Sequence, residues 1–91
     1  MRTEMHAIVS GIVQGVGFRW FVWRAAERLQ VTGYVRNGAD GSVELVAQGE
    51  RAQLELLLDV LRHGPPGARV TAVDLSWQEA RGEFEAFEIR H

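Results

Sequence analysis

The sequence contains no cysteine and no lysine among its 91 residues. Without cysteine, the chain forms no disulfide and has neither a thiolate nucleophile nor a cysteine-based metal site. Without lysine, it has no P-loop lysine and no Schiff-base chemistry, and all ten of its basic residues are arginines. Long apolar runs are missing too. We therefore expect neither a signal peptide nor a membrane span, and we expect a cytoplasmic protein.

Composition and charge narrow the class further. Apolar residues make up 46% of the chain, which is enough for a hydrophobic core, and the length predicts a single domain over residues 1–91. The net charge of −2 argues against bulk binding of nucleic acid, which depends on many phosphate contacts. We expect a monomer with no nucleic-acid and no membrane partner.

Hydrophobic periodicity predicts a series of short elements. Alternating or β-branched runs predict strands, a helical stripe of apolar residues predicts a helix, and Gly-Pro-Pro-Gly at 64–67 ends the second helix. In the first strand, Gly11 would let a helix pack closely. In the third, Ser42, Glu44 and Gln48 should point outward. The expected strands are 5–13, 31–36, 42–48, 69–79 and a short last one within 84–89, with helices at 20–30 and 50–63.

This order, β-α-β-β-α-β with one strand appended, predicts an α+β fold. Two split β-α-β units give a ferredoxin-like two-layer sandwich, in which an antiparallel four-stranded sheet carries both helices on one face. The short extra C-terminal strand is an addition to that plan.

The loop between the first strand and the first helix is the main candidate site. Gly15 and Gly17 precede Arg19, which lies where a helix begins and where the helix dipole disfavours a cation. No Ser, Thr, Asp or Asn is present there to cap the free N–H groups. An anion bound by the loop would resolve both conflicts. The alternative is an ordinary glycine turn followed by a solvated arginine, and the glycine spacing matches neither a Walker loop nor a dinucleotide fingerprint.

Asn37 is the second candidate. Asn before Gly is a common turn residue, and that structural interpretation stays open. In this fold, however, the end of the second strand can lie beside the loop after the first. A carboxamide there could orient a water molecule, because it both donates and accepts hydrogen bonds.

Other functional groups lack supporting patterns. The three histidines are scattered without ligand spacing, no serine has a nearby His–acid pair, and the acidic residues suggest turns or solvated faces, so we expect no metal site. RNA-recognition domains share the β-α-β-β-α-β plan, and Gly17 to Val22 loosely resembles their signature. That signature, however, belongs on the third strand, which has no aromatic residue here.

Two long motifs resemble those of the acylphosphatase family. The first is Gly11-x-Val13-Gln14-Gly15-Val16-x-Phe18-Arg19, and the second runs from Gly33-Tyr34-Val35-Arg36-Asn37 through Asp40-Gly41 to Val43-Glu44. Gly-Pro-Pro-Gly-Ala-Arg-Val at 64–70 and Phe-Glu-Ile-Arg at 87–90 are similar to bacterial members. The chain departs from the family pattern at Gln30, where Gly is frequent, and at His91, where Tyr is common.

The resemblance implies a small hydrolase that uses no metal and no cofactor and splits the carboxyl–phosphate bond of acyl phosphates. Its partners would be a small-molecule acyl phosphate and inorganic phosphate. The family's catalytic residues correspond to Arg19 and Asn37. Its phosphate cradle of backbone N–H groups corresponds to Gln14, Gly15, Val16, Gly17, Phe18 and Arg19.

The chemistry of such a substrate agrees with this small set of groups. A carboxylate, whose conjugate acid has a pKa of about 4, leaves without a general acid. Phosphoryl transfer needs mainly positioning and charge stabilisation. We expect direct in-line attack by a water that Asn37 orients. The alternative is a non-catalytic module of the same fold that binds phosphate or a carbamoyl group, and a free-standing chain with both residues favours the enzyme.

Overall fold

The computed structural model describes residues 2–91 and contains every element that the sequence predicts. The largest differences are at three boundaries, since the first strand begins before residue 5, the first helix begins before residue 20 and the last strand begins after residue 84. In chain order the elements are β1 (Thr3–Ile12), α1 (Phe18–Leu29), β2 (Thr32–Asn37), β3 (Val43–Gly49), α2 (Arg51–His63), β4 (Arg69–Glu79) and β5 (Phe87–Arg90).

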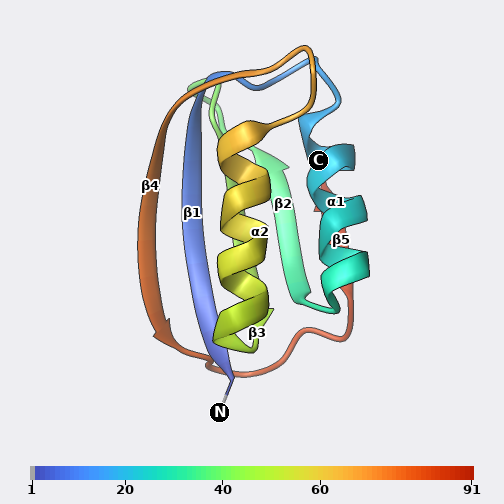
Figure 1. Ribbon diagram of the computed structural model, residues 1–91, viewed down its shortest axis with the longest axis vertical. Helices are drawn as coiled ribbons and strands as arrows, with labels where there is room; N and C mark the ends of the chain where they lie inside the picture. The colour runs from blue at the N-terminus through green and yellow to red at the C-terminus, as the bar shows by residue number, and fades with distance from the viewer. Residues whose placement is uncertain (1) are drawn as a thin grey trace.

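The strands form one sheet in the order β4-β1-β3-β2-β5. The first four strands pair antiparallel, and both helices cover the same face of the sheet (Figure 1), so the predicted ferredoxin-like sandwich is confirmed. The appended strand β5 pairs parallel with β2, with Gly33 opposite Phe87, and extends the sheet to five strands.

The core lies between the sheet and the helices. Alternate residues of β1 and β3 point into it, as the period-2 pattern predicts. On α2 the leucines at helical spacing are all buried, which confirms the stripe. The buried apolar residues of these elements are Met5, Ala7, Val9, Val43, Leu45, Ala47, Leu54, Leu57, Leu58 and Leu61.

The surroundings of Gly11, Gln48 and Ser42 differ from those expected. A Cβ on Gly11 would lie 2.0 Å from the carbonyl oxygen of Arg69, so the glycine makes room for the neighbouring strand β4 and not for a helix. The β1–β4 register shifts between Ser10 and Gly11, which is where the bulge brings the two backbones together. Gln48 lies opposite Glu4 on the outward face of the sheet, as expected, yet it is 0% exposed, and its Nε2 donates to Oε1 of Glu4 at 2.8 Å. Ser42, also expected to point outward, is buried beside Asp40, to which its hydroxyl donates.

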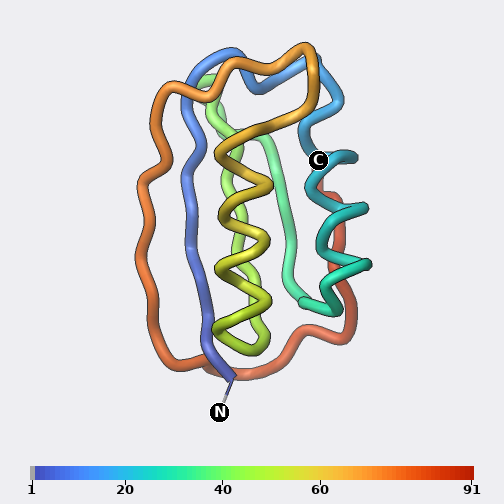
Figure 2. The backbone as a smooth tube through the Cα atoms, in the orientation of Figure 1, coloured from blue at the N-terminus to red at the C-terminus, as the bar shows by residue number. Residues whose placement is uncertain are grey.

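Several connections meet at one end of the sandwich. The β1–α1 loop and the segment after α2 run side by side across this end in Figure 2, and a Cβ on Gly67 would lie 3.6 Å from Cβ of Val16. The β2–β3 turn lies at the same end, since β2 is antiparallel to β3 and β3 is antiparallel to β1. The fold thus brings the two candidate stretches, 14–19 and the turn after Asn37, to one end of the molecule.

Candidate active site

Helix α1 begins without any of the usual capping groups. Its N-cap is Gly17, with φ 77°, no side chain caps the free N–H groups, and the first turn contains no acidic residue. Arg19 is the second residue of this helix, so the conflict inferred from the sequence exists in the folded chain. The helix N-terminus presents partial positive charge beside a cation, which suits a bound anion.

The loop before the helix presents backbone donors to open space. Gly15 has φ 74°, and a Cβ on Gly15 or Gly17 would have no heavy atom within 4 Å. Within residues 2–91, no group accepts a hydrogen bond from the backbone N–H of Gly15, Val16 or Gly17. Donors of this kind are costly to leave unpaired unless water or a ligand reaches them, and here the space is available.

The side chain of Arg19 is held by the end of the chain. Its Nη1 donates to the carbonyl oxygen of Arg90 at 3.1 Å and to Nδ1 of His91 at 3.2 Å. One edge of the guanidinium therefore has partners, and the planar group is oriented while other donors remain for an oxyanion.

Asn37 is the last residue of β2 and is exposed. The turn that follows it is tightly bonded: the backbone N–H of Gly38 donates to the carbonyl of Ser42 at 2.8 Å, and Oγ of Ser42 donates to Oδ1 of Asp40 at 2.6 Å. The hydroxyl of Ser42, followed by its backbone N–H, lowers the pKa of the Asp40 carboxyl. Asp40 therefore acts as the turn residue that the sequence predicted, and it holds the segment that carries Asn37.

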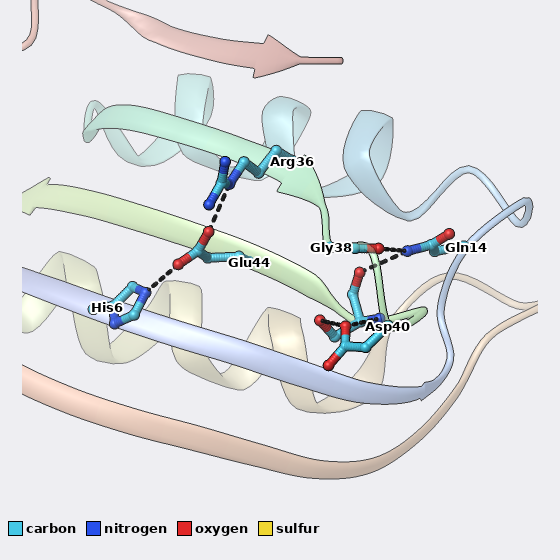
Figure 3. A network of polar contacts seen from close by, with 7 residues as sticks. His6, Gln14, Arg36, Gly38, Asp40 and Glu44 are labelled. Atoms are coloured by element: carbon cyan, nitrogen blue, oxygen red, sulfur yellow. Dashed lines mark hydrogen bonds and ion pairs between the residues drawn. The ribbon is translucent and has the colours of Figure 1, made fainter.

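Gln14 links the two candidate stretches through its side chain. Nε2 donates to the carbonyl of Gly38 and to the carbonyl of Ser42, each at 2.8 Å (Figure 3). The sequence predicts a role only for the backbone N–H of Gln14. The side-chain contact was not predicted, and it fixes the β1–α1 loop against the β2–β3 turn.

A pocket of about 240 Å³ lies between these parts. Most of the predicted site residues line it, whereas Gln14 and Val16 do not, and Val16 instead packs against the core. The predicted residues in the lining are Gly15, Gly17, Phe18, Arg19 and Asn37. The pocket thus brings together the loop and the asparagine, which are far apart in the sequence.

The pocket is also lined by residues that the sequence does not predict to be there. Trp20, Ile89 and His91 line it, together with Val13. For Trp20 a signal was present, since it directly follows Arg19 at the helix start. Ile89 and His91 belong to the C-terminal stretch compared with the family, but nothing in the sequence places them at this pocket, because their place depends on β5 joining β2 beside α1.

A charge network lies beside the site on the sheet face that the helices leave uncovered. Oε2 of Glu44 is 2.6 Å from Nε2 of His6, and Oε1 accepts from Nε of Arg36 at 2.6 Å (Figure 3). The hydrogen bonds with His6 and then Arg36 lower the pKa of Glu44, and the bond to Glu44 raises the pKa of Arg36. Since Arg36 directly precedes Asn37, the network supports the end of β2.

Two further observations concern the residues that the structure describes. Among residues 2–91, no cluster of three or more His, Cys, Asp or Glu side chains is arranged to hold a metal ion. Neither α1 nor α2 has the length and apolar character that a helix needs to cross a bilayer, and no other helix occurs in that range.

Comparison with protein families identifies the family of the chain. The acylphosphatase family model matches residues 5–89. The chain belongs to the acylphosphatase family. A protein from Salinibacter ruber, named acylphosphatase, is 51% identical over 87 residues, which cover 96% of this chain and 92% of that protein.

Solved structures extend the comparison to three dimensions. The acylphosphatase from Bacillus subtilis superposes with a TM-score of 0.95 at 32% identity and covers 98% of this acylphosphatase family member and 99% of its own chain. HypF from T. kodakarensis matches with a TM-score of 0.85 at 34% identity. That match covers 97% of this chain but only 12% of HypF. The same fold therefore also occurs as a small part of a larger protein.

Proposed function

We propose that the pocket between Arg19 and Asn37 is the active site in which this chain hydrolyses acyl phosphates. The observation that carries the proposal is that one pocket contains the glycine loop with its open N–H groups, the guanidinium of Arg19 and the carboxamide of Asn37. Hydrolysis of acyl phosphates is the activity of the family to which the chain belongs.

The N-terminus of α1 and its loop bind the phosphoryl group in this proposal. The backbone N–H groups of residues 14–19 donate to the phosphoryl oxygens, and Arg19 adds a charge-assisted fork. Because these donors are already oriented, they stabilise the charge that develops in the transition state without reorganising. The contacts of Arg19 with Arg90 and His91 keep the guanidinium in place.

Asn37 orients the attacking water. The oxygen of that water forms a bond to phosphorus while the bond from phosphorus to the acyl oxygen breaks, and the carboxylate leaves with the electron pair. The substrate dianion and water give a carboxylate monoanion and dihydrogen phosphate, so atoms and charge balance. The proton of the water passes to a phosphoryl oxygen, which makes a protein general base unnecessary.

The experiment is hydrolysis of acetyl phosphate by the purified protein in excess chelator and in water enriched in ¹⁸O. We expect turnover to continue and the label to appear in phosphate. Label in acetate would contradict attack at phosphorus, and loss of turnover in chelator would contradict a metal-free reaction. Binding of phosphate without turnover would instead indicate the non-catalytic module.

Substitutions separate the two catalytic roles. Arg19→Ala should lower kcat/KM about a thousandfold and weaken inhibition by inorganic phosphate, because the same group binds substrate and transition state. Asn37→Ala should lower kcat about a hundredfold while phosphate still inhibits, because the loop remains. Steady-state kinetics with phosphate inhibition measure both.

Arg24→Ala is the matched control for the loss of charge. Arg24 is exposed on the same helix and does not line the pocket, so its removal should leave the kinetics within about twofold. Full turnover by Asn37→Ala would remove the water-orienting role from the proposal.

Three further expectations stay predictions. They are the single-domain organisation over residues 1–91, the monomeric state and the cytoplasmic location. Light scattering of the purified protein measures the second, and cell fractionation measures the third.

A further inference from the structure

Trp20 lines the pocket, but the phosphoryl chemistry proposed above does not use its side chain. Its indole has no part in the phosphoryl binding proposed above, yet it lines the pocket beside Arg19 and the residue is 55% exposed. Leaving so large an apolar surface in water forgoes the free energy that its burial would provide.

The indole of Trp20 is held in one orientation. Its ring stacks on Trp23, one turn further along α1, with centroids 5.0 Å apart and planes 12° from parallel. Trp23 is itself anchored, because its Nε1 donates to the carbonyl of Phe87 in β5 at 3.0 Å. Trp20 therefore offers a fixed aromatic surface.

The lining of the pocket combines polar and apolar groups. Arg19, Asn37 and the glycine loop supply its polar groups, while Val13, Trp20 and Ile89 supply apolar side chains. An acyl phosphate likewise combines two kinds of group, a highly charged phosphoryl group and an acyl group that does not carry the phosphate charge. The polar groups account for the first end only.

We propose that Trp20 contacts the acyl group of the substrate and makes the enzyme favour aromatic acyl phosphates over acetyl phosphate. Aromatic rings stack on one another with favourable offset or edge geometry, and a held indole loses little conformational freedom when a ring packs on it. An acetyl group is too small to cover the indole, so its contact with Trp20 contributes little binding free energy. The inference rests on the proposed function, because it requires that the phosphoryl group bind at Arg19.

The test compares kcat/KM for benzoyl phosphate and acetyl phosphate in the wild type and in three variants. Trp20→Ala should lower the benzoyl-to-acetyl ratio about tenfold, and Trp20→Phe, which keeps an aromatic face, should retain most of it. Leu56→Ala is the control: Leu56 is likewise a large exposed apolar residue, at 50%, but lies on α2 outside this pocket, and its ratio should equal the wild-type ratio.

Inhibition by inorganic phosphate distinguishes contact with the acyl group from damage to the loop. The phosphate inhibition constant should change less than about twofold in Trp20→Ala, because phosphate has no acyl group. An unchanged benzoyl-to-acetyl ratio, or a phosphate constant that rises as much as the ratio falls, would overturn the role of Trp20. If the wild type hydrolysed neither substrate, the proposed function itself would fail.

Discussion

Glu44 contacts two basic side chains from different strands. Its carboxylate is 2.6 Å from His6 of β1 and 2.6 Å from Arg36 of β2, and its side chain is only 18% exposed. The low exposure makes these contacts stronger than an ordinary surface ion pair, because less water screens them. The hydrogen bond with His6 is the main cause of the lowered pKa of Glu44.

The pH dependence of stability follows from that direction. A carboxyl whose pKa is lowered from 4.5 on folding stabilises the protein above that value, and the contribution is lost as the pH falls through the lowered pKa. Glu44→Gln should therefore reduce the free energy of unfolding at neutral pH by about 1 kcal/mol and should narrow the difference between neutral pH and about pH 3. Urea unfolding at both pH values measures this.

Glu55→Gln is the matched control. Glu55 pairs with Arg51 on α2, but both side chains are more than half exposed, at 52% and 54%. We expect no measurable change in unfolding free energy at either pH. An equal effect of the two substitutions would contradict the role given to Glu44.

Arg19, Asn37 and Gln14 show which site residues a sequence can and cannot predict. The sequence predicts Arg19 and Asn37 as site residues because one violates a helix-start preference and both stand in long motifs, and both line the same pocket. The side-chain role of Gln14 was missed, because its acceptors are carbonyls of Gly38 and Ser42, and backbone acceptors leave no mark on the residue type.

Helix α1 ends in an unfavourable conformation. Its C-cap Gln30 has φ 59°, in the left-handed region, and it is the residue that departs from the glycine expected at this position. Its N–H bonds to the carbonyls of Ala26 and Glu27, so the cap geometry is complete and only the residue type is strained. The departure was visible in the sequence, but its cost depends on the backbone angle.

Gln30→Gly should therefore stabilise the protein. Glycine adopts positive φ without a Cβ clash, and we expect a gain of about 1 kcal/mol in the free energy of unfolding and about 5 °C in Tm. Calorimetry measures both. The control is Gln53→Gly inside α2, where the same change should lower the free energy of unfolding by about 1 kcal/mol. A loss of stability in Gln30→Gly would show that the side chain of Gln30 stabilises the protein by more than the backbone strain destabilises it.

The start of α1, near the site, was predicted less well than the bounds of α2. The sequence placed the start of α1 at residue 20, whereas the helix begins at Phe18. The error arises because Gly17 caps through its own left-handed backbone and not through a side chain, so no capping residue marks the start. The stripe of leucines on α2, by contrast, determined that helix to within one residue.

At the scale of the whole molecule, β5 completes the end that contains the proposed active site. Its parallel pairing with β2 lays the C-terminal segment beside α1, where Arg90 accepts a hydrogen bond from Arg19 and Phe87 accepts one from Trp23. Phe87 is 3% exposed and anchors the strand in the core. The last strand is thus part of the site although no predicted catalytic residue lies on it.

Phe87→Ala should affect both stability and catalysis. Loss of a buried ring should reduce the free energy of unfolding by about 3 kcal/mol, and the loosened strand should hold Arg19 less well, so kcat/KM should fall. Denaturant unfolding and acetyl phosphate kinetics at low temperature measure these effects.

Phe84→Ala is a control of the same chemical type. Phe84 is half-buried and lies before β5. Its ring packs edge-on against that of Tyr34, with the ring centroids 5.9 Å apart. Its loss should reduce the free energy of unfolding by about 1 kcal/mol and leave kcat/KM within about twofold of the wild-type value. Unchanged kinetics in a folded Phe87→Ala variant would show that β5 does not position Arg19.

The sequence by itself determined the order of the elements, the inward faces of β1 and β3 and the two motifs with Arg19 and Asn37. These follow from periodicity and local backbone preferences, which act within a few residues. Only the tertiary structure decided that Arg90 and His91 hold Arg19, that Gln14 ties the loop to the turn, and that Trp20 forms a wall of the pocket. Those contacts depend on how the sheet edge closes beside α1, and no spacing within the chain encodes that closure.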